Sequence, residues 1–149
     1  MKRVALAVLL LASTVPAAPG ATERVYYRSR VGLSVHYPSG WTVVRRHLTP
    51  CTNPIQRMAL RRGGALVLLM ESLDLPRYVK RFPRRPERFR LRGDPQWLVC
   101  CEPLHKRGWM LDFRDGGRAF YAYVYGSSRA ARAQAIAILD SLRVRPRSR

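Results

Sequence analysis

A run of six apolar residues, Ala65 to Met70, constrains the fold of this chain more than any other segment. Successive side chains of a strand point to opposite faces of a sheet, so a strand that is apolar at every position needs cover on both faces. The run is far shorter than the roughly 20 residues that span a bilayer. Gly63 and Gly64 provide a turn directly before it. We therefore expect a central strand, covered on both sides.

Other patterns indicate the remaining strands. Leu33 to Tyr37 alternates apolar and polar residues, as a half-buried strand does, and Ile55 to Leu60 is a weaker strand pattern. Asp115-Gly116-Gly117 separates two extended segments, 109–114 and 118–125, and predicts a hairpin. Its second strand places three tyrosines on one face, opposite three apolar residues: Tyr121, Tyr123 and Tyr125 against Phe120, Ala122 and Val124. We expect these tyrosines to pack with wet hydroxyls; the alternative is an exposed stripe that stacks bases or sugars.

The last element is a helix, because apolar residues recur at helical spacing after a capping serine. Ser127 or Ser128 provides the cap, and one face of the helix collects Ala131, Ala135, Ile138, Leu139 and Leu142. Strands followed by a packing helix predict an α+β fold, an antiparallel sheet covered by helices.

Two motifs carry a resemblance to a known family. Gly32-Leu33-Ser34-Val35-His36-Tyr37-Pro38-Ser39-Gly40-Trp41 is similar to the opening strand of PsbP-like and DcrB-like secreted domains, and Ala135-Ile136-Ala137-Ile138-Leu139-Asp140-Ser141-Leu142 resembles their closing helix. The resemblance implies a PsbP-like α/β/α sandwich, as in extracytoplasmic accessory proteins. It carries over no catalytic residues.

The N-terminus has the three-part pattern of a secretory signal peptide. A positive start, Met1-Lys2-Arg3, precedes the apolar run Val4 to Ala12, and small residues with two prolines follow to Ala21. We expect residues 1–21 to be removed, residues 22–145 to form a single domain, and residues 146–149 to form a basic tail. The expected product is a secreted monomer with no membrane-spanning segment after cleavage.

The chain is strongly basic, and its charge has two interpretations. The net charge is +19, and it falls to +17 with the loss of Lys2 and Arg3. All the other basic residues but Lys80 and Lys106 are arginine, which is typical of G+C-rich codon usage. A basic surface also attracts polyanions. The segment 77–92 is the candidate contact surface, at Arg77, Lys80, Arg81, Arg84, Arg85 and Arg88; the alternative is a solvated mobile loop.

Three cysteines in a secreted chain predict one disulfide and one free thiol. Adjacent cysteines rarely bridge each other, so Cys51 is expected to pair with Cys100 or Cys101, and we favour Cys100. A zinc site that adds His47 and His105 is the alternative, although its spacing departs from the usual knuckle. A weaker alternative is a nucleophilic thiol at Cys101 that is activated by His105, four residues away, as its base.

The sequence contains no nucleophile elbow, zinc-protease motif or phosphate-binding glycine loop. We therefore expect a non-enzyme without cofactor or metal: a secreted accessory or binding protein whose protein or envelope partner is unknown. The alternative is a basic protein that binds polyanions outside the cytoplasm, whether an envelope polymer, anionic lipid or nucleic acid.

Thiol counting tests the cysteine prediction. Native protein prepared without reductant should show one titratable thiol, and reduction should expose two more. Cys51→Ser should cost about 4 kcal/mol or less, because the bridge closes a long loop of the unfolded chain. Three thiols in the native protein, or one equivalent of bound zinc, would contradict the disulfide.

Overall fold

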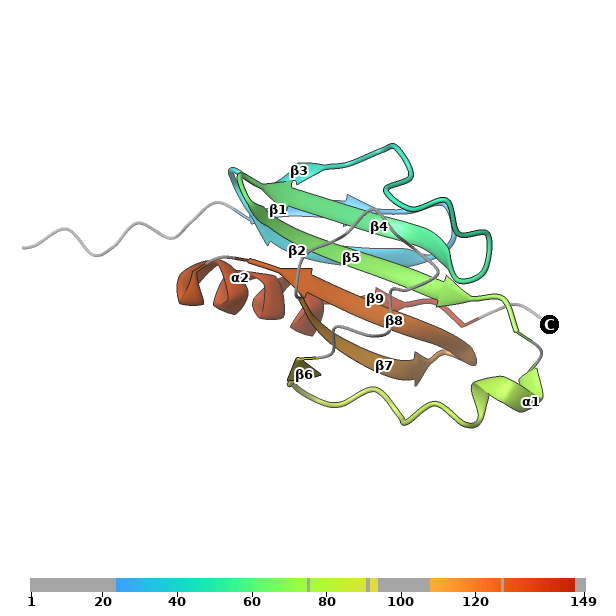
Figure 1. Ribbon diagram of the computed structural model, residues 1–149. Helices are drawn as coiled ribbons and strands as arrows, with labels where there is room; N and C mark the ends of the chain where they lie inside the picture. Colours follow the sequence, from blue (N-terminus) through green and yellow to red (C-terminus); the bar gives the residue numbers. More distant parts are fainter. Residues whose placement is uncertain (1–23, 75, 91, 94–107, 127, 147–149) are drawn as a thin grey trace, which may run out of the picture.

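The structure, a computed structural model, describes residues 24–74, 76–90, 92–93, 108–126 and 128–146. Its strands form two antiparallel sheets (Figure 1). The smaller sheet has the order β1-β2-β9, with β1 at Arg24–Arg28, β2 at Leu33–Pro38 and β9 at Arg143–Val144. In Figure 1, β1 and β2 lie behind the strands of the larger sheet.

The larger sheet has the order β3-β4-β5-β8-β7-β6. Its strands are β3 (Thr42–Val43), β4 (Ile55–Arg62), β5 (Ala65–Ser72), β8 (Arg118–Tyr125), β7 (Trp109–Asp115) and β6 (Arg92–Gly93). Every residue of β5 is buried, and β5 pairs with β4 on one side and β8 on the other. The predicted central strand is confirmed.

The hairpin of β7 and β8 is also confirmed. Asp115 pairs with Arg118, so the loop between the strands has two residues, Gly116 and Gly117, at φ angles of 57° and 73°. Two consecutive residues with positive φ match the twist of a tight hairpin, and glycine adopts them without steric cost.

Helix α2, Arg129–Asp140, is the predicted closing helix. The Ser128 hydroxyl caps it by accepting a hydrogen bond from the Ala131 N–H at 3.1 Å. Ala135, Ile138 and Leu139 form its buried face, and α2 contacts β2, β5 and β8. The other helix, α1, is a single turn at Pro76–Val79, where the basic segment 77–92 begins.

Apolar residues on the two faces of the larger sheet form two clusters. The main core lies between the two sheets and α2, and it includes Phe120, Ala122 and Val124 of β8. Tyr123 is buried in the second cluster on the opposite face, where Tyr121 and Tyr125 pack against it. Burial raises the pKa of Tyr123, and the neighbouring Tyr125 raises it further. The tyrosines are packed, as expected, but Tyr123 is only 1% exposed and so lacks the wet hydroxyl that was predicted.

Three features differ from the sequence prediction. The strands form two sheets where one was expected, and Arg143–Val144, for which no strand was predicted, form β9. β1 was not predicted, because its exposed charged residues lack an apolar alternation. Residues 96–101, for which the sequence also favours an extended segment, lie outside the described residues. Within the described ranges, no helix is long and apolar enough to cross a membrane.

Truncation of Leu139 tests the packing of α2. Leu139 is fully buried, so Leu139→Ala should destabilise the protein by about 2–5 kcal/mol through lost burial and the cavity left behind. The matched control is Leu73→Ala, because Leu73 is 42% exposed, and it should cost no more than about 0.5 kcal/mol. Urea unfolding measures both. Equal effects would contradict the placement of α2.

Candidate functional site

The larger sheet buries one carboxylate, that of Glu71 near the end of β5. Glu71 is 1% exposed. It lies on the same face of β5 as Val67 and Leu69, the face that packs in the main core. A buried carboxylate is strongly unfavourable unless it is paired and hydrogen-bonded. The surrounding strands must therefore supply cations.

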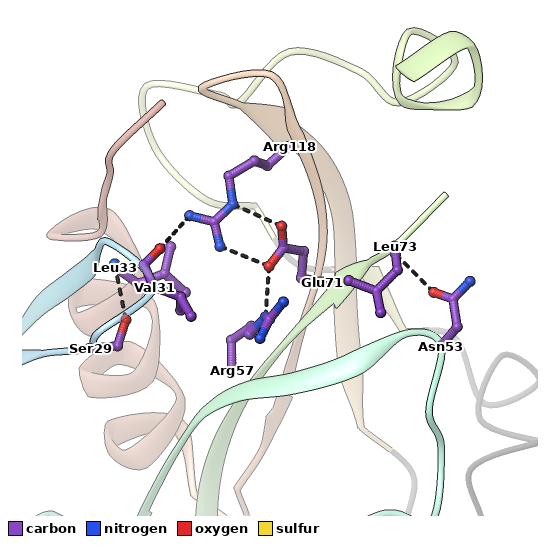
Figure 2. Close-up of polar contacts among 8 residues, drawn as sticks. All are labelled: Ser29, Val31, Leu33, Asn53, Arg57, Glu71, Leu73 and Arg118. Atoms are coloured by element: carbon purple, nitrogen blue, oxygen red, sulfur yellow. Dashed lines mark hydrogen bonds and ion pairs between the residues drawn. The ribbon is translucent and has the colours of Figure 1, made fainter. Parts of the chain in front are cut away.

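Arg118, at the start of β8, is the first of these cations. Its Nε and Nη2 donate to the two Glu71 oxygens at 2.8 and 2.7 Å, a bidentate pair, and its Nη1 donates to the Val31 carbonyl at 2.8 Å (Figure 2). Val31 lies in the turn between β1 and β2, so this guanidinium joins the two sheets. Arg118 is itself only 5% exposed.

Arg57, on β4, supplies the second cation. Gln56 pairs with Met70 and Met58 with Leu69, so Arg57 is an extra residue, a β-bulge. A bulge changes the direction of a side chain from the one that regular alternation along the strand would give it. Here the Arg57 Nε donates to Glu71 Oε2 at 2.7 Å (Figure 2). No hydrogen bond to a described residue involves its two Nη groups, and the side chain is 20% exposed.

These contacts fix the ionisation of Glu71. Burial favours the neutral acid, but the hydrogen bonds and charges of Arg118 and then Arg57 outweigh burial. The pKa of Glu71 is therefore held below its ordinary value. The carboxylate is charged at neutral pH and accepts hydrogen bonds from both arginines.

A pocket of about 350 Å³, here called the Glu71 pocket, opens beside this cluster. It is lined by Arg30, Val31, Gly32, Arg57, Glu71, Arg118, Arg145 and Pro146. Four arginines thus surround one carboxylate. Because Arg118 already forms a bidentate pair with Glu71, the remaining three arginines leave the pocket with a net positive charge.

A second recess adjoins the first, since Arg30 and Arg57 line both. This recess, here called the tyrosine groove after Tyr26 and Tyr27, has a volume of about 520 Å³ and lies between β1 and β4. Its lining is residues 26–30, 43–45, 47 and 56–59. None of the described residues that line it carries a negative charge. Burial raises the pKa of Tyr27, partly offset by the charge of Arg45, so these two side chains are electrostatically coupled.

The six basic residues predicted as a polyanion contact lie on α1 and the strap, defined here as residues 80–90. Arg77 and Arg81 lie over the ring of Tyr78. Arg85 donates to the Asp115 carboxylate at 3.2 Å and to the Asp140 carbonyl at 3.1 Å. Lys80, Arg84 and Arg88 are exposed. Arg77 and Arg81 are exposed as well, so Arg85 is the one half-buried member of the predicted set.

The strap is attached to the folded core, unlike the mobile loop considered from the sequence. Its backbone hydrogen-bonds β7, through Arg85 N–H to the Arg114 carbonyl and Arg114 N–H to the Pro83 carbonyl, at 2.9 and 2.7 Å. The Phe89 N–H donates to the Asp140 carboxylate at 2.7 Å, and the Phe89 ring packs in the main core.

Sequence reasoning missed the Glu71 pocket and the tyrosine groove. One signal was available: Glu71 directly follows the run predicted to be buried on both faces, and a carboxylate there requires a cation. Its partners come from strands whose register the sequence does not show. The bulge at Arg57 also interrupts the alternation of side chains between the two faces of β4, so the sequence pattern does not predict which face Arg57 occupies.

The cysteine predictions fall largely outside the described residues. Cys51 is half-buried against the second cluster and has a partner in the structure, but Cys100, Cys101 and His105 are not described. The disulfide therefore stays a prediction. Among the described residues, no group of three or more histidine, cysteine or carboxylate side chains could hold a metal.

Comparison with known proteins gives no family: the sequence matches no protein-family model and no curated protein.

Glu71→Gln tests the buried cluster. At pH 7 it should cost about 3–5 kcal/mol, because it leaves the Arg118 charge buried without its counter-charge. The lowered pKa means that the ionic contribution of Glu71 is complete above the ordinary pKa of 4.5 and is lost as pH falls through the folded-state pKa. The stability difference between wild type and variant should therefore shrink below pH 4.5.

Urea unfolding of both proteins over a series of acidic pH values measures that difference. Glu87→Gln is the control, because Glu87 is exposed on the strap. It should change stability by no more than about 0.5 kcal/mol at pH 7. A Glu71→Gln variant as stable as wild type, or a difference independent of pH, would refute this account of the cluster.

Proposed function

We propose that this chain is a secreted, non-catalytic accessory protein that binds anionic groups of its partner at the Glu71 pocket and the tyrosine groove. The observation that carries the proposal is the charge of these adjoining recesses. Their described lining contains six arginines and a single carboxylate: Arg28, Arg30, Arg45, Arg57, Arg118 and Arg145, with Glu71. Since Arg118 pairs with Glu71, the remaining arginines are available to a ligand.

The chemistry of these arginines suits phosphate and carboxylate ligands. A guanidinium presents a planar set of donors that matches either group bidentately. Within the described part of the chain, the side chains of Arg28, Arg30, Arg45 and Arg145 form no ion pair. All four side chains are exposed, but they line two adjoining recesses, so a ligand that enters a recess can contact several of them at once.

Secretion and the PsbP-like or DcrB-like assignment form part of this proposal. Their support is the N-terminal pattern at 1–21 and the motifs at 32–41 and 135–142. The sequence also suggested a polyanion-binding protein. The proposal keeps anion binding and assigns it to a particular place on the molecule. The anion enters a recess between the two sheets and does not simply coat a basic surface.

Calorimetric titration with tripolyphosphate at about 150 mM salt, where purely electrostatic surface contacts are weakened, tests the proposal. The groove variant, Arg30→Gln with Arg45→Gln and Arg57→Gln, should bind about tenfold or more weakly, since it removes several charge-assisted hydrogen bonds.

The surface variant, Arg61→Gln with Arg129→Gln and Arg143→Gln, is the matched control, because it removes the same charge from exposed positions outside the pockets. It should bind within about twofold of wild type. Equal losses in the two variants, or no binding at this salt concentration, would refute the proposal. Arg30→Gln with Arg45→Gln, both exposed, repeats the test without altering the Glu71 cluster.

A further inference from the structure

A third basic recess, the hairpin pocket, lies next to the Glu71 pocket. It has a volume of about 490 Å³ and is lined by the strap and the β7–β8 turn, including Lys80, Arg84, Arg114 and Gly116. A Cβ added to Gly116 would lie 3.2 Å from the Pro146 Cα, and Pro146 lines the Glu71 pocket. The two pockets therefore lie on either side of the contact between the turn and the C-terminal segment.

The hairpin pocket also has an excess of cations. Its one described carboxylate, Asp115, pairs with Arg85 at 3.2 Å. Lys80, Arg84 and Arg114 also line it, and none of the three forms an ion pair with a described residue. The pocket therefore keeps a positive charge after its internal pair is formed.

The backbone that carries these cations is held in place before any ligand arrives. Arg84 forms a β-bridge with Arg114, and the flanking hydrogen bonds join the strap to β7. Arg85 ties the strap to Asp115 and to the end of α2. Preorganised cations spare a ligand the entropy of ordering a loop.

We propose that the tyrosine groove, the Glu71 pocket and the hairpin pocket together bind one linear polyanion along a track. The track passes from Arg45 to Arg57, which lines both the groove and the Glu71 pocket, and then crosses the Gly116–Pro146 contact to Arg84 in the hairpin pocket. A chain with repeated anionic groups can place one group in each recess, whereas a flat anionic surface cannot enter them. This inference rests on the proposed function and specifies its ligand class.

Chain-length dependence tests the track. Long-chain polyphosphate should bind about a hundredfold more tightly per chain than tripolyphosphate at the same salt concentration, because each additional recess is filled intramolecularly. The hairpin variant, Lys80→Gln with Arg84→Gln and Arg114→Gln, should lose most of that gain and keep the affinity for tripolyphosphate. The surface variant defined above should keep both affinities within about twofold.

The outcomes separate this inference from the proposed function. If tripolyphosphate requires the groove arginines but the hairpin and surface variants bind long polyphosphate equally, the track is wrong and the function stands. If tripolyphosphate does not require the groove arginines, the proposed function is wrong. Lys80→Gln with Arg84→Gln, both exposed, keeps the test valid if the change at Arg114 impairs folding.

Further probes distinguish the sources of the anion. Single-stranded oligothymidylate and polygalacturonate present phosphodiesters and carboxylates on flexible chains; length-dependent binding of either through the hairpin pocket supports the track, and the tighter one identifies the source. Tighter binding to phosphatidylglycerol vesicles or duplex DNA than to any flexible chain, unchanged in the hairpin variant, would overturn it.

Discussion

The arrangement of the two sheets depends on the bidentate pair between Glu71 and Arg118. The Glu71 carboxylate belongs to the central strand of the larger sheet, whereas the third donor of Arg118 reaches the Val31 carbonyl in the smaller sheet's turn. Both side chains are nearly excluded from water. Burying such a pair brings little net stability compared with an apolar core, but breaking it is costly. Its main effect is to specify how the turn before β2 sits against β5 and β8.

The same pair determines the charge of the candidate site. Without Arg118, Glu71 would need both oxygens satisfied by Arg57, and it would repel an anion entering the pocket. With Arg118 in place, Arg57 gives only its Nε to Glu71, and its Nη groups face no described acceptor. A structural ion pair thus turns a site with one carboxylate into a recess suited to anions.

Local sequence patterns predicted much of the fold but little of the site. The central strand, the hairpin and the capped helix follow from apolar periodicity and turn residues that lie close together in sequence. β1 and β9 escaped prediction because they are short or charged strands that gain their partners only through long-range pairing. The site combines residues from β4, β5, β8 and two chain segments near 30 and 145. Composition suggested an anionic partner, whereas the position of the proposed site depends on the strand register and on the bulge at Arg57.

In the proposed function, Arg118 stabilises the fold while Arg57 contacts the ligand. Nuclear magnetic resonance of the arginine Nε–H groups, assigned with single-residue variants, measures both side chains during a titration with tripolyphosphate. The account predicts that the Arg57 signal shifts saturably and that the Arg118 signal, fixed between Glu71 and Val31, stays in place. A shift of Arg118 equal to that of Arg57, or a shift of neither while binding occurs, would contradict it.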